Sequence, residues 1–111
     1  MTMIPTMTLT DREWVRKIVD HIDEVGWCTG ATKKSSGRVC LIGGGVEVTT
    51  GVSMESEDED SFDIEEQIAA RLFVALNVAS SFRDPWTAVS RYNDDFGDWE
   101  DLKKDVLGRI S

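Results

Sequence analysis

The side chains with the widest chemical repertoire in this sequence are two cysteines and a single histidine. Cys28, Cys40 and His21 would together supply three zinc ligands, but structural zinc sites use four ligands and place their cysteines in close pairs. A nucleophilic cysteine needs a positive surrounding that lowers its thiol pKa, and Cys28, followed by Lys33 and Lys34, meets this condition better than Cys40. We therefore predict no metal site and no cofactor, and interpret Cys40 as a small buried apolar residue.

Asn93 and Asp94 form a polar pair just before the last predicted helix. Both side chains are able to accept hydrogen bonds from backbone amides, so the favoured interpretation is that they cap that helix. The alternative is that they meet Cys28 or Cys40 in a shared cleft, which a small thiol or polar-site hydrolase would require. Because no nucleophile, base and orienting group stand together, we predict no catalytic residue.

A dense run of carboxylates occupies residues 55–66, where eight of twelve residues are Asp or Glu. The run lacks the alternating ligands and central glycine of a calcium-binding loop. We therefore predict a solvated acidic loop over 52–61. The carboxylates that it offers to a partner are Glu55, Glu57, Asp58, Glu59 and Asp60.

Phe82 and Trp86 flank the sequence Arg83-Asp84-Pro85. Partly exposed aromatic side chains are common at protein interfaces, so this pair is a candidate binding patch. The alternative is that both side chains complete a core. A glycine run over 43–45 is not a phosphate-binding loop, because none of the surrounding patterns of such loops is present.

The overall charge narrows the class of partner. The chain holds 21 acidic and 12 basic residues, for a formal net charge of −9, which repels a nucleic-acid backbone. An acidic surface suits a basic protein partner or mimicry of DNA toward a DNA-binding protein, and a homodimer is also compatible with the sequence. We expect no membrane span and no signal peptide, and so a cytoplasmic protein whose cysteines remain thiols.

Helical periodicity and capping patterns predict a mainly α, compact small domain of about four helices. A capping box, T-x-x-E, predicts a helix from Thr10 to a stop at Gly26. Further helices are expected from Ser61 or Asp63, over 85–92 and after Asp98. The prediction is one domain over 10–111, following a flexible tail at 1–9, and its common interior holds three large side chains, Trp14, Leu72 and Leu102.

The segment between the first two helices is ambiguous. Residues 39–50 contain β-branched side chains that favour strands, and three consecutive glycines that favour neither strand nor helix. Propensity alone predicts a short β-hairpin within 29–50.

Three short motifs resemble those of a family of small uncharacterised actinobacterial and actinophage proteins. They are GWCTGA at 26–31, CLIGG at 40–44 and YND at 92–94, and they occur in the order of the family's G-W-x-x-G-A, C-x-x-G-A and W-N-D elements. The resemblance covers the chain from about Thr10 to the end, although Tyr92 replaces the usual tryptophan. It implies a helical domain in which 41–50 is a short buried helix, and it supplies no catalytic residue.

These observations favour a noncatalytic protein-binding accessory module, encoded by a phage or mobile element and acting on a host protein. The alternatives are the small hydrolase and an acidic DNA-mimic inhibitor. The binding residues proposed from the sequence are the acidic run, the aromatic pair and the polar pair described above.

Overall fold

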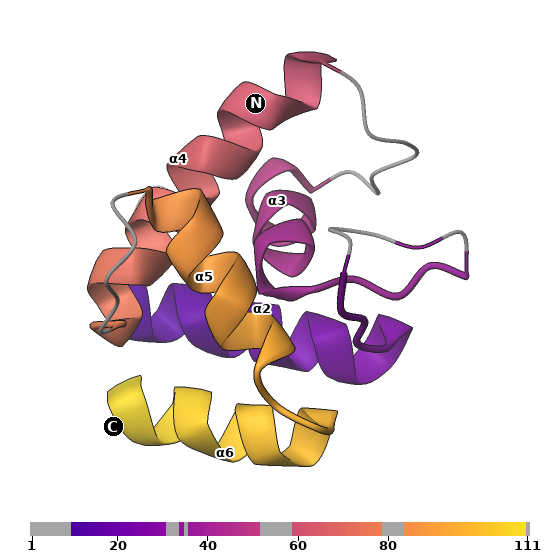
Figure 1. The fold of residues 1–111 in the computed structure, drawn as a ribbon, viewed down its shortest axis with the longest axis vertical. Coiled ribbons are helices and arrows are strands. Elements are labelled where there is room, and N and C mark those ends of the chain that lie inside the picture. The colour runs from indigo at the N-terminus through magenta and orange to yellow at the C-terminus, as the bar shows by residue number, and fades with distance from the viewer. Residues whose placement is uncertain (1–9, 31–33, 35, 52–58, 79–83, 111) are drawn as a thin grey trace.

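The computed structural model describes residues 10–30, 34, 36–51, 59–78 and 84–110. Within these ranges the chain forms five helices that pack around one interior, with a radius of gyration of 12.7 Å (Figure 1). Trp14, Leu72 and Leu102 are fully buried in the same apolar cluster, which confirms the predicted common core. The tail at 1–9 and most of the predicted acidic loop lie outside the described residues.

The first helix, α2 (Asp11–Val25), has both of its predicted ends. The Thr10 hydroxyl accepts a hydrogen bond from the Glu13 amide, and the Glu13 carboxylate accepts one from the Thr10 amide in return. This capping box satisfies amides that have no partner within the helix. Gly26 ends the helix with a φ of 101°, a positive value that glycine adopts more easily than other residues.

The second helix, α3 (Leu41–Thr50), lies at the centre of the molecule, in contact with α2, α4 and α5. The predicted β-hairpin is therefore wrong, and the helix implied by the family resemblance is correct. The only strand-like pairing in the described residues is one parallel bridge between Trp27 and Val39. Burial decided the outcome, because an interior helix gains packing on every side and this gain outweighs a poor intrinsic propensity.

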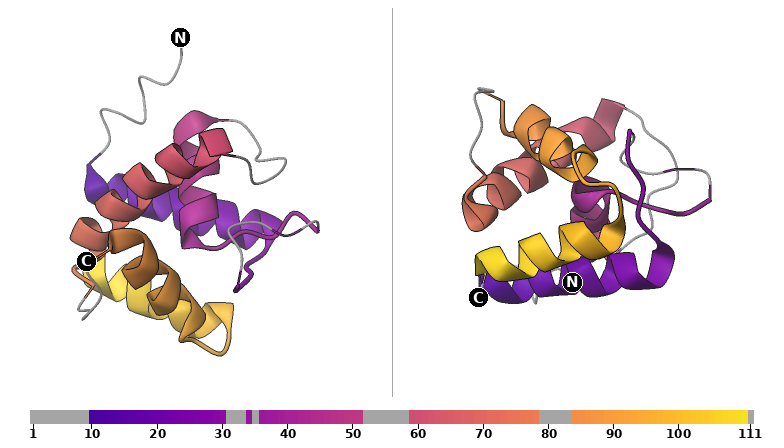
Figure 2. Two further views of the ribbon diagram at one scale, coloured as in Figure 1. Left: turned by 45° about the horizontal axis from the view of Figure 1, so that its top comes forward. Right: turned by 60° about the horizontal axis from the view of Figure 1, so that its bottom comes forward.

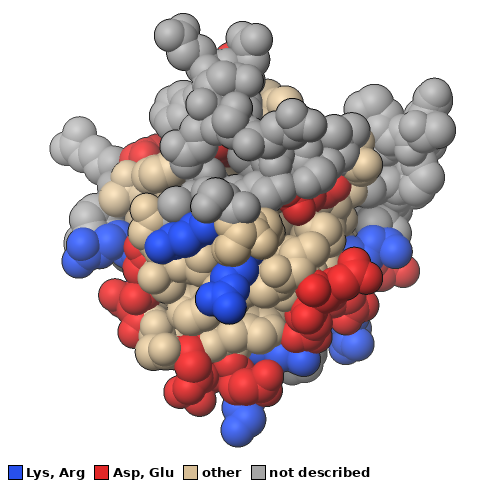
Figure 3. Space-filling view, turned by 90° about the vertical axis from the view of Figure 1, so that its right-hand side faces the viewer, with Lys and Arg blue, Asp and Glu red and all other residues tan. Residues whose placement is uncertain are grey.

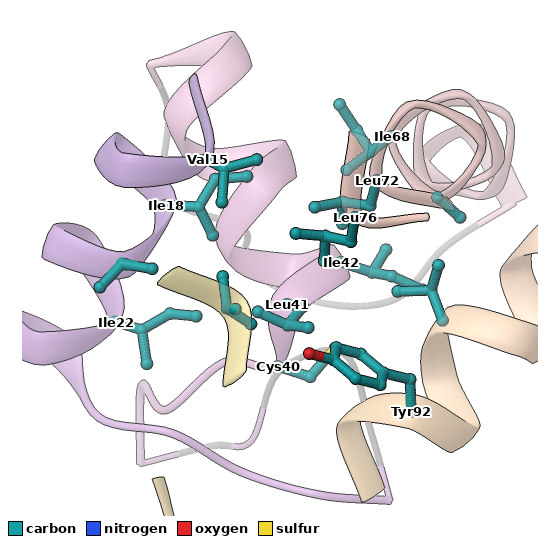
Figure 4. Packing of buried hydrophobic residues seen from close by; sticks show 14 of the residues in the cluster. Val15, Ile18, Ile22, Cys40, Leu41, Ile42, Ile68, Leu72, Leu76 and Tyr92 are labelled. Atoms are coloured by element: carbon teal, nitrogen blue, oxygen red, sulfur yellow. The ribbon is translucent and has the colours of Figure 1, made fainter. Parts of the chain in front are cut away.

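The glycines of α3 allow this close packing. A Cβ atom at Gly44 would lie 3.1 Å from an Ile22 side-chain atom, and one at Gly45 would lie 2.4 Å from Cγ2 of Ile68. Figure 4 shows Ile18 and Ile22 approaching α3 from α2, while Ile68 and neighbouring side chains approach it from α4. The glycines therefore bring two neighbouring helices close to the α3 backbone.

The other helices are α4 (Glu59–Leu76), α5 (Pro85–Asp94) and α6 (Trp99–Ile110). Asp84 caps α5 by accepting a hydrogen bond from the Thr87 amide, and Asp98 caps α6 by accepting one from the Asp101 amide. Helices α2 and α6 run antiparallel and side by side (Figure 2). Where the start of α2 meets the end of α6, the Arg12 guanidinium donates to the Ile110 carbonyl at 2.8 Å. None of the described helices is long and apolar enough to cross a membrane.

All four tryptophans tie one element to another through their indole N–H groups. The acceptors for Trp14, Trp27, Trp86 and Trp99 are, in that order, Thr49, Asn93, Glu65 and Asp23. Each indole thus combines apolar burial with one directed hydrogen bond between two elements.

Candidate functional site

The three motifs of the sequence meet at the side chain of Asn93, which is 1% exposed. Its Oδ1 accepts hydrogen bonds from Nε1 of Trp27 at 2.9 Å and from the backbone amide of Leu41 at 3.1 Å. Its Nδ2 donates to the Cys28 carbonyl at 3.2 Å and to Oδ1 of Asp94 at 2.9 Å. Both lone pairs and both N–H groups of the amide are therefore used. We call Asn93, Trp27, Cys28 and Leu41 the inner junction.

Asn93 caps a helix other than the predicted one. Leu41 is the first residue of α3, so the bond from its amide to Asn93 makes Asn93 a cap for α3, supplied from α5. The last helix, α6, is capped by Asp98, after which its start was predicted. Asp94 is exposed and accepts a hydrogen bond from the Gly30 amide at 3.3 Å, so it holds the turn after Cys28.

A second junction lies at the surface beside the first. The carboxylate of Asp23 on α2 accepts hydrogen bonds from Nε1 of Trp99 at 2.7 Å and from Nζ of Lys103 at 2.8 Å, both on α6. These two bonds hold the pKa of Asp23 below its usual value, and the Lys103 bond contributes most. The rings of Trp27 and Trp99 stack with centroids 6.4 Å apart, which connects the two junctions. We call Asp23, Trp99 and Lys103 the outer junction.

The two cysteines are free thiols and are almost completely buried, with exposures of 6% for Cys28 and 5% for Cys40. Burial raises the pKa of the Cys40 thiol to about 12. Burial also raises the pKa of the Cys28 thiol, although the charges of Lys34 and Arg38 oppose this effect. Since the thiolate is the nucleophile, these surroundings do not favour thiol catalysis at neutral pH.

The single histidine bonds to a buried carboxylate. Nε2 of His21 on α2 lies 2.5 Å from Oε1 of Glu47, which projects from α3 and is buried. Within the described ranges, no group of three His, Cys, Asp or Glu side chains is placed to hold a metal ion. The pair joins two helices, as both junctions do.

A third polar cluster links α5 to α6. The Tyr92 hydroxyl donates to Asp105, and Nε of Arg109 donates to the same carboxylate at 2.6 Å. Burial and the neighbouring carboxylate raise the pKa of Tyr92, whereas Arg109 and Tyr92 together lower the pKa of Asp105. Arg109 also donates to the carbonyls of Leu76 and Asn77, which anchors α6 against the end of α4. The tyrosine of the YND motif therefore has its own structural partner.

The described members of the predicted binding surface differ in their surroundings. Trp86 is half-buried, and its indole donates to the buried carboxylate of Glu65 at 3.3 Å. Glu59 and Asp60 belong to the first turn of α4, so the helix begins slightly earlier than predicted. The remaining predicted binding residues, Phe82, Glu55, Glu57 and Asp58, lie outside the described residues.

The structure reveals where an acidic surface forms, which the sequence did not indicate. Exposed carboxylates cover the turn between α5 and α6 and the adjacent end of α2, and we call them the acidic face: Asp20, Asp23, Glu24, Asp94, Asp95, Asp98, Glu100 and Asp101. In Figure 3, acidic side chains gather along the lower part of the side of the molecule that faces the viewer. The hydrogen bonds of the outer junction establish that the two segments are adjacent. No local signal predicts this, because the segments are far apart in the sequence.

Comparison with known proteins places the chain in a family. No curated protein and no solved structure gives a significant match. A family profile matches residues 7–104, which includes all three motifs and every helix except the end of α6. The chain belongs to this family, DUF6197, a family of unknown function.

Proposed function

We propose that the protein is a noncatalytic protein-binding module whose acidic face binds a basic partner protein. The observation that carries the proposal is the joining of two acidic segments into one exposed surface. Asp20, Asp23 and Glu24 have the three- and four-residue spacing that puts side chains on one side of a helix. The α5–α6 turn adds five more carboxylates beside them.

Aromatic groups within the acidic face give it an apolar component. Trp27, Phe96 and Trp99 are each partly buried and pack against the core cluster. Aromatic residues are enriched at protein interfaces because they supply large contact areas. Carboxylates around such groups would attract lysine and arginine side chains and accelerate association at low salt.

The chemistry of the interior supports a binding role better than a catalytic one. The polar side chains with catalytic potential, Asn93, Asp23 and Tyr92, hold helices together, and both thiols are buried. The hydrolase alternative therefore gains no support. If the chain is encoded by a phage or mobile element, as its motifs suggest, then the partner is a host protein, and we expect the two to meet in the cytoplasm.

The test is affinity capture from a lysate of the source organism with two matched charge variants. The first pair, Asp95→Asn with Glu100→Gln, removes two charges from the acidic face. The control pair, Asp63→Asn with Glu66→Gln, removes two charges from exposed positions on α4. A partner that uses the acidic face should bind the first variant roughly three- to tenfold more weakly, and its binding should weaken with rising salt.

Two results would support the proposal only in combination. The same protein must be captured by the unmodified chain and by the control pair, and its capture must fall for the acidic-face pair. Equal capture by both variants would assign binding to another surface. A larger loss for the α4 pair would instead point to the acidic run at the start of α4.

A further inference from the structure

Cys28 and Cys40 belong to two segments that pair in parallel. The Val39 amide donates to the Gly26 carbonyl at 3.0 Å, and the Cys28 amide donates to the Val39 carbonyl at 3.1 Å. This pattern defines the parallel bridge between Trp27 and Val39. In such a register the next residue on each segment, here the two cysteines, lies opposite the other, with both side chains on the same side.

The surroundings of the two thiols agree with this placement. Both are buried, and each lies within electrostatic range of Asp94, while the charge of one thiolate acts on the other. Neighbouring chains in a sheet are separated by about 4.8 Å. Disulfides join Cα atoms that are about 4.4–6.8 Å apart, a range that includes this spacing.

We propose that Cys28 and Cys40 are a redox-sensitive pair that forms an intramolecular disulfide when the protein meets a low-molecular-weight disulfide. This modification is independent of the proposed binding function. The bond would join the residue whose carbonyl accepts from Asn93 to the residue that precedes α3. It would therefore link covalently the two backbone segments that Asn93 holds together.

The reaction consists of two thiol–disulfide exchanges. The Cys28 thiolate attacks oxidised glutathione, which forms a mixed disulfide and releases one glutathione thiolate. The Cys40 thiolate then attacks Sγ of Cys28, which forms the Cys28–Cys40 bond and releases the second glutathione. The two protons lost by the protein thiols are taken up by the two glutathione thiolates. Two protein thiols are oxidised and one glutathione disulfide is reduced.

Cys28 is the better entry point for the oxidant. Its Sγ donates to the Arg38 carbonyl at 3.5 Å, next to a turn where Lys34 and Arg38 are exposed. Cys40 is surrounded by apolar side chains of the core. Because burial raises the pKa of both thiols and limits access to them, few thiolates form at neutral pH, and oxidation should be slow in the folded protein. It should accelerate as denaturant opens this turn.

The test uses the folded full chain with oxidised glutathione, followed by alkylation of the remaining thiols and mass spectrometry. We expect a loss of about 2 Da, no alkylation, and a proteolytic fragment that contains both cysteines in linked form. The short loop that the bond closes should raise the melting temperature by about 5 °C or more, reversibly with dithiothreitol. Cys28→Ala and Cys40→Ala should show neither change.

Several outcomes would overturn the proposal. These are alkylation of both cysteines after prolonged oxidation, a stable glutathione adduct without closure, a disulfide-linked dimer, or a linked monomer that melts at a lower temperature. The mass result for the unmodified chain stands by itself if one alanine variant fails to fold. The remaining variant then serves as the control.

Discussion

The inner and outer junctions are built alike but lie in different surroundings. In each, one side chain accepts hydrogen bonds from a tryptophan and from a second group on another segment. Asn93 is buried and uncharged, whereas Asp23 is exposed and charged. Burial removes competition from water, so an unsatisfied group costs much more inside than at the surface. The same hydrogen-bonding pattern should therefore contribute more to stability in the buried inner junction than in the exposed outer junction.

The largest expected effect comes from removing the inner junction. Asn93→Ala leaves the indole N–H of Trp27, the amide of Leu41 and the carbonyl of Cys28 without their partner. We expect the free energy of unfolding to fall by about 3–5 kcal/mol, measured by urea denaturation. Asp94→Ala, the adjacent exposed position, should cost less than about 1 kcal/mol. Similar losses for the two variants would contradict the special energetic weight that we assign to the buried Asn93.

The next largest effect tests how tightly the interior around α3 is packed, whereas the first tested the hydrogen bonds of the inner junction. Gly45→Ala places a methyl group against Ile68 and should cost about 1–3 kcal/mol despite the better helix propensity of alanine. Gly108→Ala on α6 is the control, because no described atom lies within 4 Å of the new Cβ. This control should stabilise the protein by about 0.5–1 kcal/mol in thermal or urea unfolding. A stabilising Gly45→Ala would contradict the close approach.

A direct comparison of the junctions replaces one tryptophan in each. Trp27→Phe and Trp99→Phe both delete an indole N–H and replace one indole of the stacked pair with a smaller phenyl ring. The Trp27 variant should be less stable than the Trp99 variant by about 1 kcal/mol, because the Asn93 oxygen remains buried whereas Asp23 is open to water. Chemical denaturation of both variants would measure the difference. Equal values would indicate that water reaches both acceptors.

The smallest expected effect is the pH dependence of the outer junction. The folded pKa of Asp23 lies below its usual value of 3.8, so the folded state favours the charged carboxylate. The stability contributed by Asp23 is therefore present above about pH 4 and is lost as the pH falls through the folded pKa. Asp23→Asn should reduce stability at pH 7 by at most about 1 kcal/mol, and the difference between the two proteins should shrink as the pH falls below about 4 in urea titrations. A difference that does not change with pH would assign it to another cause.

Local features of the fold were predictable from sequence, whereas non-local features were not. The Thr10 capping box, the Gly26 stop and the helix starts at Pro85 and after Asp98 each depend on neighbouring residues, and the structure contains all of them. The helix over 41–50 depends on burial by other helices, which propensity does not report. Its prediction required the family resemblance.

The candidate site shows the same limit. The sequence singled out Asn93, but it gave the wrong helix to cap, because the hydrogen-bond partners of Asn93 are 52 to 66 residues away. Trp86 was predicted as a surface aromatic without its bond to Glu65. The acidic face was not predicted, because it forms only when α2 and α6 lie side by side.

The capping of α3 from α5 also has a consequence during synthesis on the ribosome. A helix with three glycines and no cap of its own gains little from forming alone. Its cap is the side chain of Asn93, which lies 52 residues after Leu41. We therefore expect the nascent chain to leave 41–50 unstructured until α5 has emerged. The protein would then acquire its interior late and in one cooperative step, rather than helix by helix from the amino terminus.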